Sequence, residues 1–392
     1  MDLDGARNAK AEILERMLEG AGDLMSPDLE VVSDTASGAF RGTIDRSSSV
    51  LRGSVGSLSI TDALSNLAGS VPFVRSAASM ISRRIPLQHS ENRRAAAPDI
   101  AIGIQRSRER GGANLVLIAS DTKFRTHPLV ERAISLAKGE ARFVAGGEPR
   151  PLSYWQPPRR RPLMLGTSVS HHQVQAGTLG AFVTLADGTI GVISNNHVLA
   201  GVNKGKPGDS IVQPGKSDGG KVGDDDTIAT LLRFIPLVSD APNEVDCAVA
   251  SLKPDLAPSN KVVIGDGDSP LQVIGMATDE LFADDAVWKV GRTTGLTNGR
   301  VFAVEVDNFT VNMGTSWSPF RCRFDNQVQV YAEDRAFAGP GDSGSLLVDH
   351  DGKAHALLFA GSAIGGPTGT GLATFNPLAL VLEKLDAKLW IG

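Results

Sequence analysis

Residues 337–346 read Phe-Ala-Gly-Pro-Gly-Asp-Ser-Gly-Ser-Leu and contain the tetrapeptide Gly-Asp-Ser-Gly. A serine is a poor nucleophile at its free pKa, so it needs a base that takes its proton and donors that hold the resulting oxyanion. Glycines on both sides let the backbone turn so that the N–H groups of Gly341 and Ser343 point to one spot. Gly, Asp and Ser also dominate ordinary surface turns, so the tetrapeptide alone leaves both interpretations open.

Two further segments carry the partners that a nucleophilic serine needs. Residues 188–200 are a β-branched stretch that runs into a polar turn, with His197 just past the expected strand end, where a base is held firmly. Residues 243–252 are an apolar stretch with Asp246 near its start, where a carboxylate would orient the imidazole and select its tautomer. Asp246 alone could be a turn residue before a strand. The chain order His197, Asp246, Ser343 favours a catalytic triad.

A fourth segment resembles a known family. Residues 288–301 read Trp-Lys-Val-Gly-Arg-Thr-Thr-Gly-Leu-Thr-Asn-Gly-Arg-Val, similar to the Gly-Arg-Thr-Thr-Gly element of bacterial secreted peptidases of the alpha-lytic and streptogrisin kind. With the three candidate residues it makes four motifs in that family's order, over roughly residues 165–390. Residues 177–183, 194–200 and 357–362 look closer still to the intracellular trypsin-like peptidases that include the plant narrow-leaf group.

The resemblance implies a fold and an active site. The fold would be an all-β, chymotrypsin-like double barrel of two six-stranded antiparallel barrels, with the site in the cleft between them. His197, Asp246 and Ser343 would form the triad, and the backbone N–H groups of Gly341 and Ser343 would form the oxyanion hole.

The resemblance also implies a specificity pocket. The residue six positions before the nucleophile, Phe337, would lie at its base, with Ala360 and Gly361 in its wall. An acidic residue at that base selects Arg or Lys, whereas Phe337 would make the pocket apolar. We therefore expect small or medium apolar residues before the scissile bond.

The chain departs from the family in several places. Many members read Gly-Asp-Ser-Gly-Gly, where this chain has Ser345 in the last place, and secreted members have a cysteine after the catalytic histidine, where this chain has Val198. Cys247 and Cys322 are the sole cysteines, so at most one disulfide could form. Cys247 neighbours the candidate Asp on a strand, and we expect it to pack as a small apolar residue.

The residue before the nucleophile is Asp342. In secreted relatives of the trypsin branch, a freshly cut N-terminus pairs with the aspartate at this place. About 160 residues precede the peptidase-like part here, without an evident pro-segment. We therefore expect Asp342 to be satisfied by groups within the chain, without cleavage.

Composition indicates a globular protein rich in turns and strands. The 392 residues are 41% hydrophobic and 5% aromatic, with 43 glycines and 21 prolines. No apolar run approaches the roughly 20 residues that span a bilayer. The N-terminus Met-Asp-Leu-Asp-Gly-Ala-Arg lacks the basic flank and apolar core of a secretory signal, so we expect an intracellular, cytoplasmic protein.

Charge is unevenly distributed along the chain. Residues 71–165 carry a net +10, residues 166–392 a net −10 and residues 1–70 a net −5. Opposite signs predict docking between these parts, or between copies of the chain in a homo-oligomer. A nucleic-acid patch in 71–165 is disfavoured because aromatics are sparse there and no nucleic-acid-binding motif occurs.

Four parts are expected along the chain. Residues 1–95 would be an N-terminal helical and linker segment, with a helix over 6–19 that Gly20 and Gly22 stop. Residues 96–148 would be a small α+β module, 149–164 a Pro- and Arg-rich connection, and 165–392 the trypsin-like peptidase domain.

Finer elements are expected within the first two parts. The N-terminal segment would hold a Ser- and Gly-rich linker, a short helix and an amphipathic stretch, at residues 33–59, 61–67 and 73–84. The module would hold strands over 99–104, 114–119 and 141–145 and a helix over 127–138.

Metal and cofactor sites are not implied. His171 and His172 adjoin in a linker, and Asp224 to Asp226 are consecutive rather than alternating as in a calcium loop. Gly146-Gly147 and Gly365-Gly366 lack the following helix that a phosphate loop requires.

Two classes of function remain open from the sequence. The first is an intracellular serine endopeptidase acting on protein or peptide substrates, with the N-terminal region assembling copies or recruiting substrate; a peptidase that cuts only itself is a special case. The second is a non-catalytic interaction scaffold of peptidase fold. A scaffold has no chemical need for an intact triad, so His197, Asp246 and Ser343 favour the first.

Overall fold

The structure is a computed structural model, which describes residues 1–24, 100–106, 112–137, 140–147, 159–223, 225–263 and 271–392. The expected linker 33–59, the short helix 61–67 and the amphipathic stretch 73–84 lie outside these residues, as does Asp224. Met1–Met25 and Ala97–Gly392 form one compact unit, and the other unit is Ser26–Ala96.

A small α/β layer begins the described chain. Its elements are α1 (Leu3–Leu24), β1 (Ile100–Arg106), β2 (Ala113–Ala119), the 3-10 helix η1 (Thr122–Thr126), α4 (Pro128–Leu136) and β3 (Ala141–Ala145). β1 runs antiparallel to β2, and β2 parallel to β3. The expected strands and helix of the module are therefore confirmed, with 141–145 matching β3 and the other ends within two residues.

The first helix is longer than the sequence predicted. It runs from Leu3 to Leu24, through Gly20 and Gly22, so the prediction that these glycines stop it was wrong. A glycine inside a helix costs about 1 kcal/mol relative to alanine, which weakens a helix without forbidding it. No helix in the described ranges is both long and apolar enough to cross a bilayer.

The three-stranded layer has two apolar faces because side chains alternate along a strand. Ile100, Ile102 and Ile104 lie in a buried cluster with Ala6 and Ile13 of α1. On the other face, Ala101, Val116, Ile118 and Val144 join a cluster with residues of the following barrel. The layer is thus packed between α1 and the barrel, and we call residues 100–147 the module.

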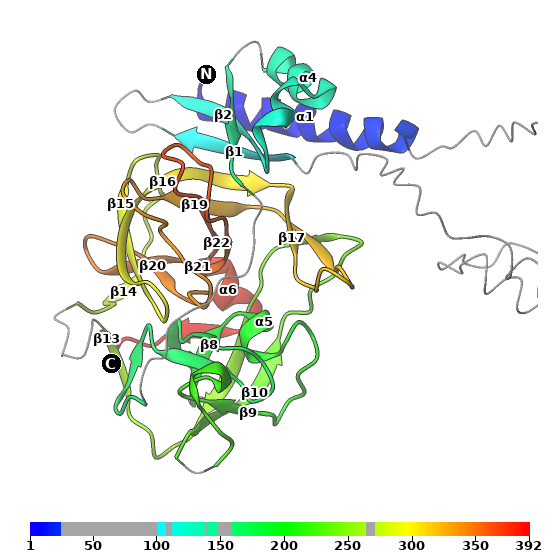
Figure 1. Ribbon diagram of the computed structural model, residues 1–392. Helices are drawn as coiled ribbons and strands as arrows, with labels where there is room; N and C mark the ends of the chain where they lie inside the picture. The colour runs from blue at the N-terminus through cyan, green and yellow to red at the C-terminus, as the bar shows by residue number, and fades with distance from the viewer. Residues whose placement is uncertain (25–99, 107–111, 138–139, 148–158, 224, 264–270) are drawn as a thin grey trace, which may run out of the picture. The chain divides into compact units, whose positions relative to one another are not determined.

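The C-terminal barrel is closed. Its strands run in the order β15-β20-β21-β22-β19-β16, and β15 pairs with β16 to complete the circle (Figure 1). The elements of this half are β14 (Gly275–Met276), β15 (Ala286–Gly291), β16 (Gly295–Asp307), β17 (Phe309–Asn312), β18 (Arg321–Phe324), β19 (Gln327–Tyr331), β20 (Leu346–Asp349), β21 (Lys353–Gly361), β22 (Ala373–Pro377), α6 (Leu378–Lys384) and β23 (Ala387–Leu389).

The module's sheet continues into this barrel. β1 pairs antiparallel with the far end of β16, at Ile102↔Asp307 and Ile104↔Val304. Two ion pairs join the basic part of the chain to the acidic peptidase-like part: Arg106–Glu280 and Arg159–Asp226. Two more, Arg7–Glu305 and Lys10–Asp307, join α1 to β16, although residues 1–70 are net acidic. The predicted docking between oppositely charged parts is confirmed for the first two pairs, whereas association between copies stays a prediction.

The N-terminal barrel is a half-barrel, an eight-stranded sheet of order β23-β7-β8-β12-β10-β9-β5-β6. In the described residues its end strands do not pair with each other, so the barrel is open and has eight strands where six were expected. The elements are β4 (Leu163–Leu165), β5 (Ser168–His171), β6 (Gly177–Thr178), β7 (Ala181–Leu185), β8 (Ile190–Ser194), α5 (Asn196–Leu199), β9 (Ser210–Val212), the 3-10 helix η2 (Lys216–Asp218), β10 (Thr227–Phe234), β11 (Pro242–Asn243), β12 (Ala248–Leu252) and β13 (Pro258–Val262).

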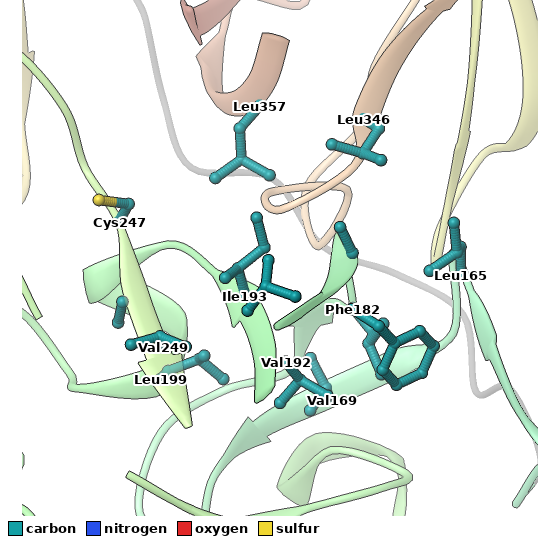
Figure 2. Close-up of a cluster of buried hydrophobic side chains, with 14 of the residues drawn as sticks. Leu165, Val169, Phe182, Val192, Ile193, Leu199, Cys247, Val249, Leu346 and Leu357 are labelled. Carbon is teal, nitrogen blue, oxygen red and sulfur yellow. The ribbon is translucent and has the colours of Figure 1, made fainter. Parts of the chain in front are cut away.

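One apolar cluster joins the two barrels. Phe182 and Ile193 of the first barrel share it with Leu346 and Leu357 of β20 and β21 (Figure 2). The chain end adds a second link, because β23 follows the second barrel but pairs with β7 of the first. These contacts fix the loops at the barrel junction, where the candidate residues lie.

Candidate active site

His197 lies on α5, a single helical turn that directly follows β8. β8 pairs with β7 on one side and β12 on the other, so the backbone leading to the imidazole is held on both edges. Val198 and Leu199 pack into the apolar cluster that joins the barrels. The prediction that His197 lies just past a strand end is confirmed, although on a helical turn and not in a loop.

Asp246 is fully buried and faces His197. Its Oδ2 lies 2.5 Å from His197 Nδ1, and its Oδ1 accepts the His197 backbone N–H at 3.2 Å. A carboxylate at Nδ1 keeps the proton on that nitrogen, which leaves Nε2 of the neutral ring free to accept one. Both oxygens therefore orient the same histidine.

The backbone of Asp246 is also held on both sides. Its carbonyl accepts from Asn195 Nδ2 at 2.8 Å, and its N–H donates to Asn376 Oδ1 at 2.9 Å. Asn376 lies in β22 of the second barrel, and its own Nδ2 donates to Gln327 Oε1 at 2.6 Å. A chain of buried amides from the second barrel thus positions a carboxylate of the first. No local pattern in the sequence distinguishes Asn376.

Ser343 lies in the loop between β19 and β20, which docks against the first barrel. Its carbonyl accepts the Thr178 N–H at 2.8 Å. A Cβ on Gly344 would lie 2.1 Å from the Thr178 carbonyl oxygen and 2.2 Å from Ser194 Oγ, and Gly344 has φ +98°, so this contact requires glycine. Because Ser194 is three residues before His197, the docking brings the serine loop to the strand that leads to the histidine.

The Ser343 hydroxyl donates to the Phe359 carbonyl at 3.4 Å. In the described part of the chain no hydrogen bond joins it to His197. Contacts between catalytic groups are often long in the absence of substrate and shorten when the reacting complex forms.

Two N–H groups beside Ser343 are free to bind an anion. Among the described residues, neither Gly341 N–H nor Ser343 N–H donates a hydrogen bond. The carbonyl of Pro340 accepts from Thr293 Oγ1 at 2.5 Å, which turns the N–H of the same peptide, that of Gly341, the other way. Thr178 Oγ1 holds the Gly341 carbonyl at 2.8 Å. These are the two N–H groups expected to form an oxyanion hole, and that role stays a prediction.

Asp342 is satisfied within the chain, as expected. Its Oδ1 accepts from the backbone N–H groups of Thr293 and Thr294, at 2.8 and 3.1 Å. Its Oδ2 accepts from the Gly339 N–H at 2.8 Å and the Thr294 hydroxyl at 2.7 Å, and lies 3.2 Å from Lys289 Nζ. Both ionic side chains are 0% exposed. Burial lowers the pKa of Lys289, and the neighbouring carboxylate of Asp342 opposes that shift.

A second buried ion pair links the barrels next to this loop. Arg292 Nε donates to Asp218 Oδ2 at 2.7 Å, and its Nη2 contacts Asp218 Oδ1. Asp218 belongs to η2 of the first barrel, whereas Arg292 directly follows β15 of the second. The Arg292 backbone N–H donates to Thr178 Oγ1 at 3.0 Å.

The Gly-Arg-Thr-Thr-Gly segment stands out in the sequence, but its side-chain contacts do not. Thr293 and Thr294 hold Pro340 and Asp342, whereas Arg292 pairs with Asp218. The sequence motif Gly-Arg-Thr-Thr-Gly is the signal that points to these threonines.

The proposed pocket residues lie in different surroundings. Phe337 is 2% exposed and packs in the interior of the second barrel, with its ring 6.1 Å from that of Phe375. Ala360 belongs to the cluster shared with the module, and Gly361 ends β21. Since Phe337 is part of the barrel core, a charge placed there would be buried, and the preference for apolar residues stays a prediction.

The two cysteines are free and buried. Cys247 packs in the apolar cluster that joins the barrels, which confirms its expected role as a small apolar residue. Burial raises the pKa of the Cys247 thiol, and that of Cys322 to about 12, so neither is suited to act as a thiolate.

Comparisons with known proteins found similar structures. No family model and no curated protein matches the chain. Thermobifida fusca protease A is 16% identical with a TM-score of 0.41, covering 58% of this chain and 98% of its own. The Nocardiopsis protease NAPase is 18% identical with a TM-score of 0.41, covering 58% and 97%. A chymotrypsin of Cellulomonas bogoriensis is 17% identical with a TM-score of 0.40, covering 58% and 98%. The strand order itself, a closed six-stranded barrel beside an eight-stranded half-barrel, gives the chain a double β-barrel fold of the chymotrypsin type.

Proposed function

We propose that the chain is a serine endopeptidase, with Ser343 as nucleophile, His197 as general base and Asp246 as the carboxylate that orients it. The observation that carries the proposal is the buried Asp246 carboxylate, both of whose oxygens accept from His197. Burying a carboxylate costs free energy unless it is paired and hydrogen-bonded. Because both oxygens of the carboxylate bind the same histidine, we infer that this carboxylate holds the imidazole ring in place.

The proposed reaction proceeds through an acyl-enzyme. Ser343 Oγ attacks the carbonyl carbon of the peptide bond while its proton passes to His197 Nε2. The tetrahedral oxyanion accepts the N–H groups of Gly341 and Ser343, and the C–N bond then breaks as His197 gives its proton to the leaving amine. Water, deprotonated by the same imidazole, hydrolyses the ester and frees the serine.

Asp246 would act through charge as well as orientation. The imidazolium that forms during attack carries a positive charge close to a carboxylate held at 2.5 Å from Nδ1. In surroundings removed from water such a pair interacts more strongly than in solvent, so the carboxylate stabilises the charged intermediate.

One observation favours the alternative, a non-catalytic scaffold: the Ser343 hydroxyl donates to the Phe359 carbonyl. In that case the hydroxyl would be a structural donor and would not react. Chemical labelling separates the two functions because a fluorophosphonate reacts with an activated serine only.

The experiment compares three forms of the full chain. The natural protein should react with a fluorophosphonate probe and cleave protein substrates, as seen from new N-termini in a lysate. Ser343→Ala or His197→Ala should lower kcat by about 10⁶-fold. Ser318→Ala, at an exposed serine of the β17–β18 hairpin, is the matched control and should behave as the natural protein does.

Two results would overturn the proposal. Undiminished proteolysis by purified Ser343→Ala would assign the activity elsewhere, and a natural protein that neither labels nor cleaves would favour the scaffold. Mixing the natural enzyme with Ser343→Ala as substrate tests the special case of a peptidase that cuts only itself. Cleavage of the Ser343→Ala chain, with no cleavage of other proteins in the lysate, would support that case.

Asp342 motivates an expectation about activation. Its carboxylate has five partners within the chain, so no new N-terminus is needed to satisfy it. The intact chain should therefore label with the fluorophosphonate without prior cleavage. Mass spectrometry would follow both labelling and cleavage of the chain. Labelling that starts only after a cut near residue 165 would contradict this expectation.

The proposed setting is intracellular, supported by two buried, unpaired cysteines and the absence of a disulfide between them. The N-terminal region is proposed to assemble copies or recruit substrate. Gel filtration of the full chain in low and high salt tests assembly, because exposed charge pairs are screened within about 8–10 Å at 0.1–0.15 M salt.

A further inference from the structure

The end of the module touches a loop that follows the serine-facing strand of the second barrel. The loop comprises residues 362–371 and connects β21 to β22. Gly366 N–H donates to the Ala145 carbonyl at 2.7 Å, and Ser362 Oγ donates to the Gly146 carbonyl. Two chain segments more than 200 residues apart are therefore joined at the end of β3 by one backbone hydrogen bond and one from a side-chain hydroxyl.

The fit between the two segments leaves no room for a side chain. A Cβ on Gly147, which has φ +74°, would lie 2.2 Å from the Ile364 carbonyl oxygen. A Cβ on Gly365 would lie 2.4 Å from the Ala145 carbonyl oxygen. Contacts below 3 Å force the backbone to shift, so the glycines are what allows this approach.

Ser362 connects this junction to the rest of the loop. Besides its bond to Gly146, its hydroxyl accepts the Leu372 N–H at 3.0 Å, and its N–H donates to the Leu372 carbonyl at 2.8 Å. The far side of the loop is held separately, since Thr368 and Thr370 both donate to the Ala332 carbonyl. The module thus sets the position of the near side, around Ser362 to Gly366.

The same loop is close to the nucleophile along β21. Ser343 Oγ contacts the carbonyl of Phe359, three residues before Ser362, which is about 10 Å along an extended strand. Ala360, in between, shares its apolar cluster with Ile118 and Val144 of the module. In the described part of the chain, residues 359–361 pair with β22 on one edge and with no strand on the other.

An unpaired strand edge can bind an extended peptide through main-chain hydrogen bonds. A peptide whose carbonyl carbon meets Ser343 and whose backbone follows this edge reaches the loop three or four residues from the scissile bond. Ile364 belongs to this loop, and 68% of its surface is exposed. A substrate side chain three or four residues from the scissile bond would contact the loop, whereas the residue at the scissile bond would not.

We propose that the module is a positioning element for extended substrates: through Ala145–Gly147 it holds the loop 362–371, and with it the binding of peptide residues three or more positions from the scissile bond. The substrates concerned are unfolded or extended protein segments with an apolar residue opposite Ile364. This inference rests on the proposed peptidase function, and it adds that residues outside the barrels determine part of the substrate selection.

Gly147→Ala in the full chain tests the proposal. A misplacement of about 1 Å can cost about 100-fold in rate, so kcat/KM for a peptide extended by four or more residues should fall about 10- to 100-fold. A single-residue ester and the fluorophosphonate do not reach the loop. Their reaction rates with Gly147→Ala should therefore stay within about threefold of those with the natural chain. Peptides extended on the N-terminal or the C-terminal side show which side reaches Ile364.

The chain offers a matched control. Gly188 has φ +82°, and a Cβ there would meet nothing within 4 Å. Gly188→Ala carries the same backbone strain outside the loop, so it should retain cleavage of the extended peptide.

A readout independent of activity keeps this test separate from that of the function. Hydrogen exchange of residues 362–371 should speed up in Gly147→Ala, and in Ser362→Ala if Gly147→Ala does not fold, but not in Ser318→Ala. Unchanged exchange, or equal cleavage of extended peptides by the Gly147 and Gly188 variants, overturns the inference. A parallel loss on ester and extended peptide also overturns it, because the change then acts on the whole site. If the natural chain does not label, the proposed peptidase function fails. Hydrogen exchange then still decides whether the module holds the loop 362–371.

Discussion

The two barrels each bury a carboxylate beside the candidate active site, and the groups that surround the two differ in kind. Asp246 of the first barrel faces the imidazole of His197. Asp342 of the second faces the ammonium of Lys289, two backbone N–H groups of a threonine pair and a threonine hydroxyl. In the proposed reaction the partner of the first carboxylate takes up a proton, whereas the partners of the second take no part.

This difference assigns the two buried carboxylates different roles: Asp246 would take part in the proposed reaction, and Asp342 holds the loop that carries Ser343. A carboxylate that has to stabilise a transient imidazolium needs a partner whose charge changes during the reaction. A carboxylate that fixes a loop needs partners that do not change. We therefore expect loss of Asp246 to affect rate far more than stability, and loss of Asp342 to affect stability first.

The largest expected effect is that of Asp246→Asn on turnover. The amide would present a donor to Nδ1, so the imidazole would adopt the wrong tautomer and kcat should fall about 10⁴-fold. Peptide hydrolysis and urea unfolding should be measured on the same sample. A loss of stability comparable to that of Asp342→Asn would break the contrast between the two carboxylates.

Asp342→Asn should have the largest effect on stability. It leaves the ammonium of Lys289 buried without a counter-charge, and removal of one partner of a buried ion pair costs about 3–5 kcal/mol. Urea unfolding measures the change. Lys289→Met combined with Asp342→Asn is the control, because removing both charges should recover much of the loss; a double variant as unstable as the single one would show that the pair itself is unimportant.

A smaller effect tests how far Asp246 depends on the other barrel. Asn376→Leu removes the acceptor of the Asp246 N–H and should cost about 1–3 kcal/mol for the unpaired buried donor, together with a measurable fall in kcat. Gln329→Leu is the matched amide control, since its side chain contacts Thr374 and not Asp246, and its Oε1 has no partner in the described residues. Equal kcat losses in both variants would argue against positioning through Asn376.

The smallest effect is expected at a partly exposed carboxylate, which sharpens the contrast with the two buried ones. Glu305 pairs with Arg7 of α1, and the side-chain hydrogen bond from Arg7 lowers the pKa of Glu305. A carboxyl with a lowered pKa contributes stability above its ordinary pKa of about 4.3, and loses it as the pH falls through the lowered value. Since ion pairs in contact with solvent contribute about 0–1 kcal/mol, Glu305→Gln should change the free energy of unfolding slightly at pH 7, and the difference should disappear as the pH falls through that lowered pKa.

The sequence identified those parts of the site whose signals are local. A β-branched run before a polar turn located His197, and alternating apolar residues located the module's strands, because both patterns are written within ten residues. The order of three motifs linked residues nearly 150 positions apart through a resemblance and not through a physical rule.

The burial of Phe337 and the length of α1 show where local reasoning ended. Sequence position alone predicted Phe337 at the base of a pocket, and the structure adds that its ring is buried in the barrel core, which no register counted across a loop could show; its role in specificity stays a prediction. Helix propensity predicted a stop at Gly20, yet the helix continues to Leu24, because propensity is a weak preference beside the rest of the structure.

By itself the sequence determined the reactive residue types, their order, and the strands and helices that carry them, because backbone preferences and side-chain periodicity act over short distances. The tertiary structure alone decided that β1 joins β16, that Lys289 neutralises Asp342, that Asn376 holds Asp246, and that Gly147 reaches the loop beside β21. Each of these contacts joins segments more than 45 residues apart, and they form because burying a charge, an amide or a strand edge is favourable only once its partner is buried with it.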